Sequence, residues 1–189
     1  MTIRTFIAID TPVGIRDDMM TLQAKLRESG ADVRWEPKEK FHATIKFLGN
    51  AEEDRIQDIV STIEDALQPV APFDVTYEGL GCFPDAKRPR VIWVGCTDED
   101  GALEELKKFL DRDLLPYGFA QEEREFHPHI TLGRVKSWRG LENLTPLLQS
   151  LTFQPQSTRC REVLLMKSVL KPTGSEYSLL QKFSLRGKE

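Results

Sequence analysis

One short alternating stretch, FHATIKFLG at positions 41–49, constrains the fold more than any other part of the chain. Read as a β-strand with a period of two residues, it places His42 and Thr44 side by side on one face. An imidazole and a hydroxyl on an apolar strand are costly to bury unless they share a polar cleft. We expect the opposite face to pack into a core, because it carries Phe41, Ala43, Ile45 and Phe47.

A second segment, FHPHITLGRV at 126–135, repeats the pattern, with His129 and Thr131 on one face. The chain has only three histidines, and two His-x-Thr pairs among them arise in about 1 to 2% of shuffled sequences. The elements around the two segments also recur in one order: strand, helix, strand, motif strand, helix, strand. We interpret this order as an internal duplication that places the two motif strands face to face across a pseudo-twofold axis.

Apolar periodicity and turn residues predict the remaining elements. Gly30 is expected to end the first helix, and Asn50 is expected to cap the second. Helices are expected at 13–28, between Asn50 and Pro69, between Asp98 and Pro116, and at 141–151. Strands are expected at 4–9, 33–36, 41–49, 73–83, 90–96, 118–121, 126–135, 161–170 and 176–185.

The composition is that of an ordinary globular domain, with 40% hydrophobic and 30% charged residues among 189. We expect a single two-lobed domain over 1–189, which is long enough to bury a sizeable core. The apolar run FIAI near the N-terminus is too short for a signal peptide, and no segment can span a membrane, so a cytoplasmic location is expected. Neither a disulfide framework nor a zinc ribbon is indicated, because only three cysteines are present and they lie far apart: Cys82, Cys96 and Cys160.

The net charge of -4 argues against a general nucleic-acid coat protein, which would usually be basic. Two local clusters of positive charge nevertheless stand out, and such clusters are more often solvated surface than binding sites. One lies in the loop after the strand at 73–83 and the other follows the second motif strand. Their members are Lys87, Arg88 and Arg90, and Arg134, Lys136 and Arg139.

The paired motifs suggest acid–base chemistry at phosphorus. An imidazole has a pKa of about 6.5, so that two neighbouring histidines can supply a general base and a general acid at neutral pH. One histidine would take a proton from the attacking oxygen while the other gives one to the leaving oxygen. Thr44 and Thr131 are placed to donate to the non-bridging phosphate oxygens, and Arg134 is the nearest candidate for a charge-assisted contact.

At this point the residues resemble a known family. The motifs HATI and HITL, their flanks FHATIKFLG and FHPHITLGR, and the N-terminal RTFIAID are similar to the two-histidine phosphoesterase superfamily. They are most similar to its RNA 2',3'-cyclic phosphodiesterase branch, also called 2'-5' RNA ligases, and the resemblance covers essentially the whole chain. It implies a bilobal α+β fold, with two antiparallel sheets facing a central cleft and helices on the outside.

The resemblance also implies roles for the four motif residues. His42 matches the proton donor, His129 the proton acceptor, and Thr44 and Thr131 the threonines that contact the phosphate. The implied reaction opens an RNA 2',3'-cyclic phosphate with water to leave a 2'-phosphate, without a metal or other cofactor, and the same site can run in reverse as a 2'-5' RNA ligase. The implied partners are RNA ends, tRNA fragments among them, and a monomer is expected.

Two alternatives from other classes remain open. A metal site could use His42, His127 and His129, because three imidazoles can hold a catalytic zinc. A binding module could instead recognise phosphorylated RNA ends or small cyclic nucleotides without turnover. His127 is expected to be peripheral to the chemistry, since Pro128 interrupts the strand there.

Two roles are considered for each of the three tryptophans: stacking on a nucleobase or packing in the core. Core packing is favoured for Trp93, which lies within the apolar segment RVIWVG. The sequence does not decide between these two roles for Trp35 and Trp138.

Overall fold

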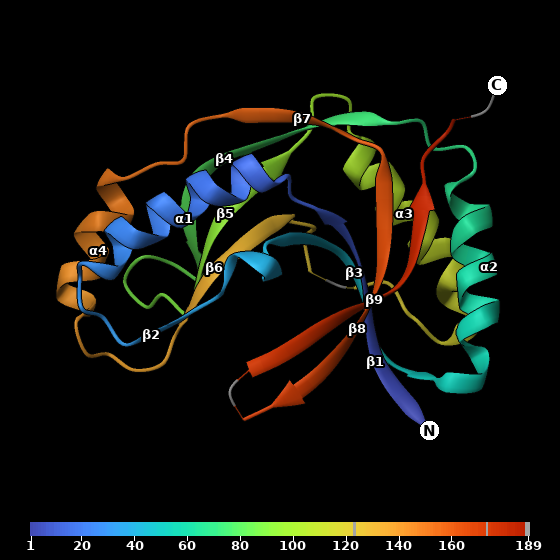
Figure 1. The fold of residues 1–189 in the computed structure, drawn as a ribbon, viewed down its shortest axis with the longest axis horizontal. Helices are drawn as coiled ribbons and strands as arrows, with labels where there is room; N and C mark the ends of the chain where they lie inside the picture. Colours follow the sequence, from blue (N-terminus) through green and yellow to red (C-terminus); the bar gives the residue numbers. More distant parts are fainter. Residues whose placement is uncertain (123, 173, 188–189) are drawn as a thin grey trace.

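The computed structural model describes residues 1–122, 124–172 and 174–187, in which four α-helices accompany a curled antiparallel sheet of nine strands (Figure 1). The α+β class is therefore confirmed. The helices are α1 (Val13–Arg27), α2 (Ile56–Leu67), α3 (Ala102–Leu114) and α4 (Leu141–Ser150). The strands are β1 (Thr2–Asp10), β2 (Val33–Trp35), β3 (His42–Glu52), β4 (Phe73–Phe83), β5 (Val91–Thr97), β6 (His129–Val135), β7 (Gln156–Cys160), β8 (Glu162–Lys171) and β9 (Gly174–Ser184).

The two motif strands lie at the centre of the sheet. The strand order is β7-β4-β5-β6-β3-β1-β8-β9, and β2 pairs with β6. The motif strands β3 and β6 are joined by one pair of residues, Ala43 and Ile130. This junction connects two antiparallel lobes, one built on β1, β3, β8 and β9, the other on β2, β4, β5, β6 and β7. Each motif strand begins a row of four strands that runs away from the junction, β6-β5-β4-β7 on one side and β3-β1-β8-β9 on the other. This symmetry is in keeping with an internal duplication, which stays a prediction.

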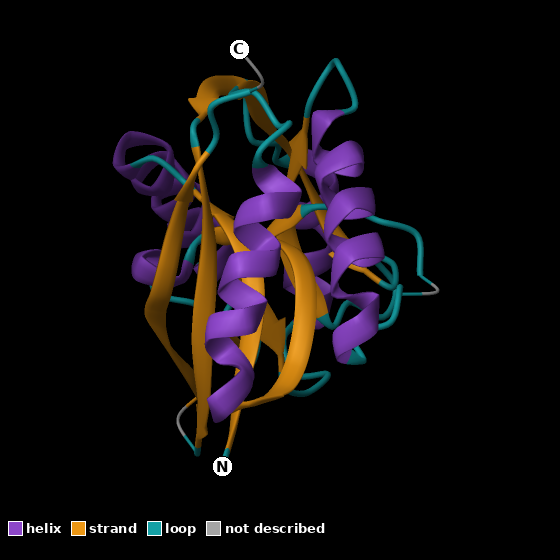
Figure 2. Ribbon diagram, turned by 90° about the vertical axis from the view of Figure 1, so that its right-hand side faces the viewer, coloured by secondary structure: helices purple, strands orange, loops and turns teal. Residues whose placement is uncertain are grey.

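The lobes do not correspond to the two halves of the sequence. β8 pairs with β1 from the other end of the chain, for example Leu164 with Ala8, and β7 pairs with β4, for example Thr158 with Val75. Helices α2 and α3 contact each other beside the β1/β3 lobe, whereas α1 and α4 contact each other at the opposite end of the molecule (Figures 1 and 2). Each lobe thus contains elements from both halves.

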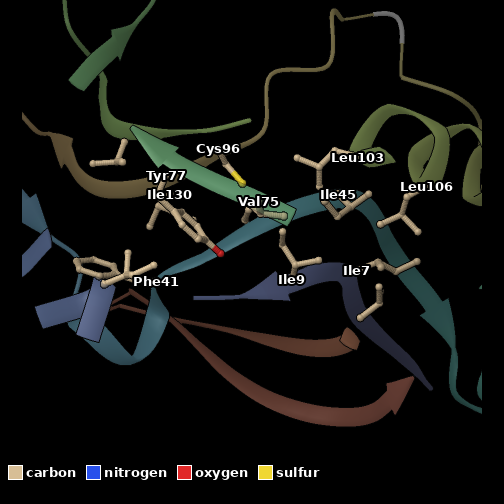
Figure 3. Close-up of a cluster of buried hydrophobic side chains, with 14 of the residues drawn as sticks. Ile7, Ile9, Phe41, Ile45, Val75, Tyr77, Cys96, Leu103, Leu106 and Ile130 are labelled. Atoms are coloured by element: carbon tan, nitrogen blue, oxygen red, sulfur yellow. The ribbon is translucent and has the colours of Figure 1, made fainter. Parts of the chain in front are cut away.

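A continuous core of buried apolar side chains lies between the sheet and the helices (Figure 3). Ile7 and Ile9 of β1 and Ile45 of β3 point into this core, and Ile45 was predicted there from the alternation of its strand. Leu103 and Leu106 of α3 close it from the helix side. Burial of these side chains stabilises the fold by about 25 cal/mol for each Å² of apolar surface removed from water.

A β-bulge in β3 breaks the alternation that the sequence predicts. Ala8 pairs with Thr44 but the preceding Ile7 pairs with Lys46, so Ile45 is an extra residue in β3. Beyond it the two faces exchange: Lys46 is buried and Phe47 is 56% exposed. The expectation that Phe47 lies in the core is therefore wrong.

Three further expectations about single elements are wrong. No strand forms at 118–121, where Gly118 takes a positive φ of 86° after the 3₁₀ turn Leu115–Tyr117. Asn50 does not cap α2, because β3 continues past it and the helix begins only at Ile56. The strand expected at 126–135 begins at His129, after Pro128, and β7 was not predicted because its alternating side chains are polar and none is fully buried.

Among the described residues, no helix combines the length and the apolar character needed to cross a lipid bilayer.

Candidate active site

A cavity of ≈ 760 Å³ opens where the two motif strands meet. All five residues expected at the site from the sequence line it: His42 and Thr44 from β3, and His129, Thr131 and Arg134 from β6. The structure thus brings together two segments that are more than eighty residues apart in the chain.

The pairing of the motif strands explains this convergence. Ala43 lies opposite Ile130 in an antiparallel ladder, and both side chains are fully buried. One residue to either side, the side chains point to the other face of the sheet. Counted in antiparallel register from that pair, His42 is opposite Thr131 and Thr44 is opposite His129, so each histidine is aligned with a threonine of the other strand.

Two aromatic rings hold His42 in place. The Phe6 ring of β1 stacks on the imidazole with centroids 5.0 Å apart and an interplanar angle of 25°, and Tyr177 of β9 meets it edge-on at 5.2 Å. The pKa of His42 is lowered to about 4, first by burial and next by the positive charge of Arg16, while a backbone hydrogen bond at Lys40 acts in the opposite direction. With this pKa the His42 imidazole is neutral at pH 7.

A main-chain carbonyl orients His129. Its Nδ1 lies 2.7 Å from the carbonyl oxygen of His127, and a carbonyl can only accept, so the ring proton is on Nδ1. The other nitrogen, Nε2, is then the one that can accept a proton. Phe83 of β4 packs edge-on against the ring at 5.1 Å, and burial lowers the pKa of His129 below its usual value despite this hydrogen bond.

One carboxylate inside the cavity, that of Glu36, lies within ion-pair distance of three cations. Glu36 Oε1 lies 3.5 Å from Nε of Arg134 and 4.0 Å from an amino nitrogen of Arg34, and Oε2 lies 3.6 Å from Nζ of Lys40. All four side chains line the cavity. Arg134 is thus held at the edge of the site by an ion pair, with a net positive charge around it that favours an anionic ligand.

His127 lies at the rim of the same cavity. Its ring packs edge-on against Trp93 at 4.8 Å and Phe83 at 5.3 Å. Within residues 1–122, 124–172 and 174–187, no three His, Cys, Asp or Glu side chains are grouped closely enough to share a metal ion. What His127 provides to His129 in this structure is its backbone carbonyl.

The tryptophans differ in their surroundings. Trp93 is half-buried against Gly81 and Phe83 and does not line the cavity, in keeping with a packing role. Trp35 packs against the core and is covered by the guanidinium of Arg27, at 5.5 Å. Trp138, in contrast, is 67% exposed.

Four residues of the site were not identified from the sequence. Phe6, Tyr177 and Phe83 hold the two imidazoles, and Glu36 holds the cations. Phe6 lies in RTFIAID, which carried part of the family resemblance, so a signal for it was present. Nothing in the local sequence relates Tyr177 to His42, because their proximity depends on the pairing of β8 with β1.

A curled antiparallel sheet whose two central strands present His-x-Thr pairs to one cavity fits the class that the motifs indicated, the two-histidine phosphoesterases. The chain belongs to the 2'-5' RNA ligase superfamily, whose family model matches residues 16–171. The resemblance inferred from the motifs is therefore confirmed at the level of the family.

Relatives and solved structures of this family match nearly the whole chain. A protein of Methanothermobacter thermautotrophicus named RNA 2',3'-cyclic phosphodiesterase is 33% identical over 98% of this chain and 100% of its own length. One of the same name from Thermotoga maritima is 32% identical over 97% and 96%. Among solved structures, TT0787 of Thermus thermophilus has a TM-score of 0.82 at 27% identity, covering 98% of this chain and 100% of its own. E. coli LigT complexed with 3'-AMP has a TM-score of 0.76 at 26% identity, covering 98% and 99%.

Proposed function

We propose that this protein hydrolyses the 2',3'-cyclic phosphate at the end of an RNA strand and leaves a 2'-phosphate. The observation that carries the proposal is the register at Ala43 and Ile130, which sets two imidazoles and two hydroxyls alternately around one cavity. The names of the relatives, RNA 2',3'-cyclic phosphodiesterase, support the choice of substrate.

In this proposal His129 is the general base. Its Nδ1 proton is engaged by the His127 carbonyl, and Nε2 takes a proton from the attacking water. The water oxygen forms a bond to phosphorus as the bond from phosphorus to O3' breaks. His42, on the opposite strand, gives its proton to O3'.

The low pKa of His42 is compatible with the role of acid only when substrate is bound. In the free protein, burial and Arg16 keep this imidazole neutral at pH 7. A phosphodiester anion seated beside it favours the protonated form and raises its pKa. Binding of substrate therefore prepares the acid, and the hydrogen bond from Nδ1 of His129 to the His127 carbonyl leaves Nε2 as the nitrogen that accepts a proton.

Thr44 and Thr131 donate to the non-bridging oxygens of the phosphate. Each is aligned with the histidine of the other strand, so that in this proposal the two hydroxyls reach the phosphate from both lobes. Hydroxyl donors aimed at the charge that develops in the transition state typically contribute about 10²–10³ in kcat. Arg134 adds a charged donor once the phosphate competes with Glu36 for its guanidinium.

The proposal extends to ligation. If the 5'-hydroxyl of a second RNA strand takes the place of the water, the same two proton transfers leave a 2'-5' phosphodiester bond. No metal or other cofactor takes part in either reaction. The proposed substrates are RNA fragments, including those of tRNA. The protein is proposed to act as a monomer in the cytoplasm.

One experiment tests this function. The protein is incubated with a short RNA ending in a 2',3'-cyclic phosphate, with and without EDTA, and the product is analysed for the position of its phosphate. A 2'-phosphate formed equally fast in EDTA is expected. A 3'-phosphate would overturn the assignment of the acid and the bond broken.

The two alternatives give different results in the same assay. Loss of turnover in EDTA and its recovery with zinc would favour the metal site of His42, His127 and His129. Tight binding of the RNA without any product would favour a binding module.

A further inference from the structure

A second hollow, of ≈ 800 Å³, borders the active-site cavity. The two share three lining residues, Phe83, Pro84 and Arg124, so the hollow continues the cavity along the surface. Its remaining walls come from the segments at 88–91 and 135–141. We refer to it as the basic groove, for the four cations that line it: Arg88, Arg90, Arg124 and Lys136.

The charge of the basic groove is unbalanced. No Asp or Glu is among its lining residues, and no charged side-chain nitrogen of its four cations comes within 4.0 Å of a carboxylate oxygen of the described residues. In the active-site cavity, by comparison, Arg34, Lys40 and Arg134 share Glu36. The chain as a whole carries a net charge of -4, so this concentration of positive charge is local. Such a surface favours a polyanion.

The backbone that presents these cations is held by hydrogen bonds. The Asp85 carboxylate accepts from the backbone nitrogens of Lys87 and Arg88, at 2.8 and 3.0 Å, which shapes the loop before β5. The Arg90 carbonyl accepts from Val135, at 2.9 Å, and joins this loop to the end of β6. Two segments far apart in the sequence thus form one positively charged surface whose shape is set before a ligand arrives.

An exposed aromatic ring lines the same groove. Trp138 is 67% exposed, and the neighbouring Ser137 donates to an Asp32 carboxylate oxygen at 2.6 Å, which anchors the segment that carries the indole. An exposed indole beside unpaired cations is the combination on which single-stranded nucleic acids bind, with bases stacking on the ring and phosphates on the cations.

We propose that the basic groove binds the single-stranded part of the RNA substrate, the nucleotides that precede the cyclic phosphate. The inference rests on the proposed function, because the strand enters the groove when its end lies between His42 and His129. A cyclic mononucleotide fills only the active-site cavity. An RNA strand extends past Phe83 and Pro84, places its phosphates on Arg88, Arg90 and Lys136, and stacks a base on Trp138.

The test compares substrates of different length in three variants. Arg88→Gln, Lys136→Gln and Trp138→Ala are assayed on a 2',3'-cyclic mononucleotide and on a short single-stranded RNA with the same terminal nucleotide. We expect wild-type protein to have a lower KM for the RNA. Each variant should lose part of that advantage, about tenfold for Trp138→Ala, while kinetics on the mononucleotide stay as in wild type. Lys108→Gln, an exposed charge on α3 in the other lobe, is the matched control and should change neither.

Direct binding gives an independent readout. Fluorescence anisotropy of a labelled single-stranded RNA ending in a 2'-phosphate, titrated at several salt concentrations, should show weaker binding in each groove variant. The logarithm of the association constant falls linearly with the logarithm of the salt concentration. The magnitude of this slope should decrease by about 0.7 for each phosphate that loses its cation in Arg88→Gln or Lys136→Gln, and should not change in Trp138→Ala.

Three results would overturn the inference. One is an unchanged preference for RNA over the mononucleotide in all three variants, and another is an equal loss on both substrates. The third is a Trp138→Ala variant that binds the single-stranded RNA as tightly as wild type does, just as it binds a blunt RNA duplex. Weaker binding is expected for the single strand alone, since only an unpaired base can stack on the indole. Wild-type protein that turns over neither substrate would refute the proposed function. If anisotropy still shows weaker RNA binding in the groove variants, the inference that the basic groove binds single-stranded RNA is supported independently.

Discussion

Nδ1 of His129 donates a hydrogen bond to the carbonyl oxygen of His127, two residues earlier, at 2.7 Å. The bond uses the backbone of His127 and leaves its imidazole free to pack on Trp93. A neutral His129 therefore has its unprotonated nitrogen fixed at Nε2, whatever side chain stands at position 127. The two histidines of this segment therefore differ in what they provide: His129 its imidazole ring, and His127 its main-chain carbonyl.

The first prediction follows from that difference. His129→Ala removes the proposed base and should lower kcat by about 10²–10⁴, whereas His127→Ala keeps the carbonyl and should lose far less. Steady-state rates on a 2',3'-cyclic mononucleotide measure both, with circular dichroism as the control for folding. An equal loss in the two variants would show that the His127 ring takes part, as the metal alternative requires.

The second prediction concerns pH. Burial lowers the pKa of both His42, to about 4, and His129 in the free protein. The profile of kcat/KM reports groups of the free enzyme, so both of its limbs should lie below pH 6.5 and its maximum should be acidic. The profile of kcat should be displaced to higher pH, because the bound phosphate anion raises both pKa values. A kcat/KM maximum above pH 7.5 would contradict the assignment of these two groups.

The third prediction concerns a buried ion cluster. Lys46, fully buried in β3, donates to Asp111 of α3 at 2.5 Å and to the Ala120 carbonyl at 2.9 Å, and Lys107 meets the same carboxylate at 3.0 Å. Asp111→Ala would leave two buried ammonium groups together and should lower the free energy of unfolding by about 3–5 kcal/mol. Lys46→Met should cost less, because Asp111 keeps Lys107 as its partner. Urea unfolding of both variants checks this order, and the reverse order would refute it.

The fourth prediction tests the bulge in β3. Ile45 is buried, so Ile45→Ala should lower the free energy of unfolding by about 2–5 kcal/mol. Phe47 is exposed beside the Phe6 ring, at 6.2 Å, and Phe47→Ala should cost less than about 1 kcal/mol. Equal costs in thermal or urea unfolding would mean that the alternation continues unbroken through the strand.

The alternation of apolar and polar residues predicted which side chains share one face of each motif strand, because it depends only on local geometry. His42 and Thr44 share one face of β3 up to the bulge, and His129 and Thr131 share one face of β6. The helix at Val13–Arg27 likewise lies within a residue of its predicted end, since its apolar spacing and the stop at Gly30 are local signals.

The rest of the site depends on pairings between distant segments, which local patterns do not contain. Tyr177 reaches His42 only because β8 pairs with β1, and a period-two reading cannot anticipate that one extra residue in β3 turns Lys46 inward. Glu36 follows a three-residue strand whose partner, β6, is about a hundred residues away. Its place among the site's cations is a result of that pairing.

The pairing of β8 with β1 also has a consequence for how the protein is made. β1 leaves the ribosome long before the strand that covers its second edge, β8 at Glu162–Lys171, is synthesised. For most of translation the edge that carries Ile7 and Ala8 has no partner, and an unpaired apolar strand edge is a site for association with other chains. Contacts of such long sequence separation also slow folding. The edge of β1 is therefore exposed to aggregation in the nascent chain until the hairpin of β8 and β9 is complete.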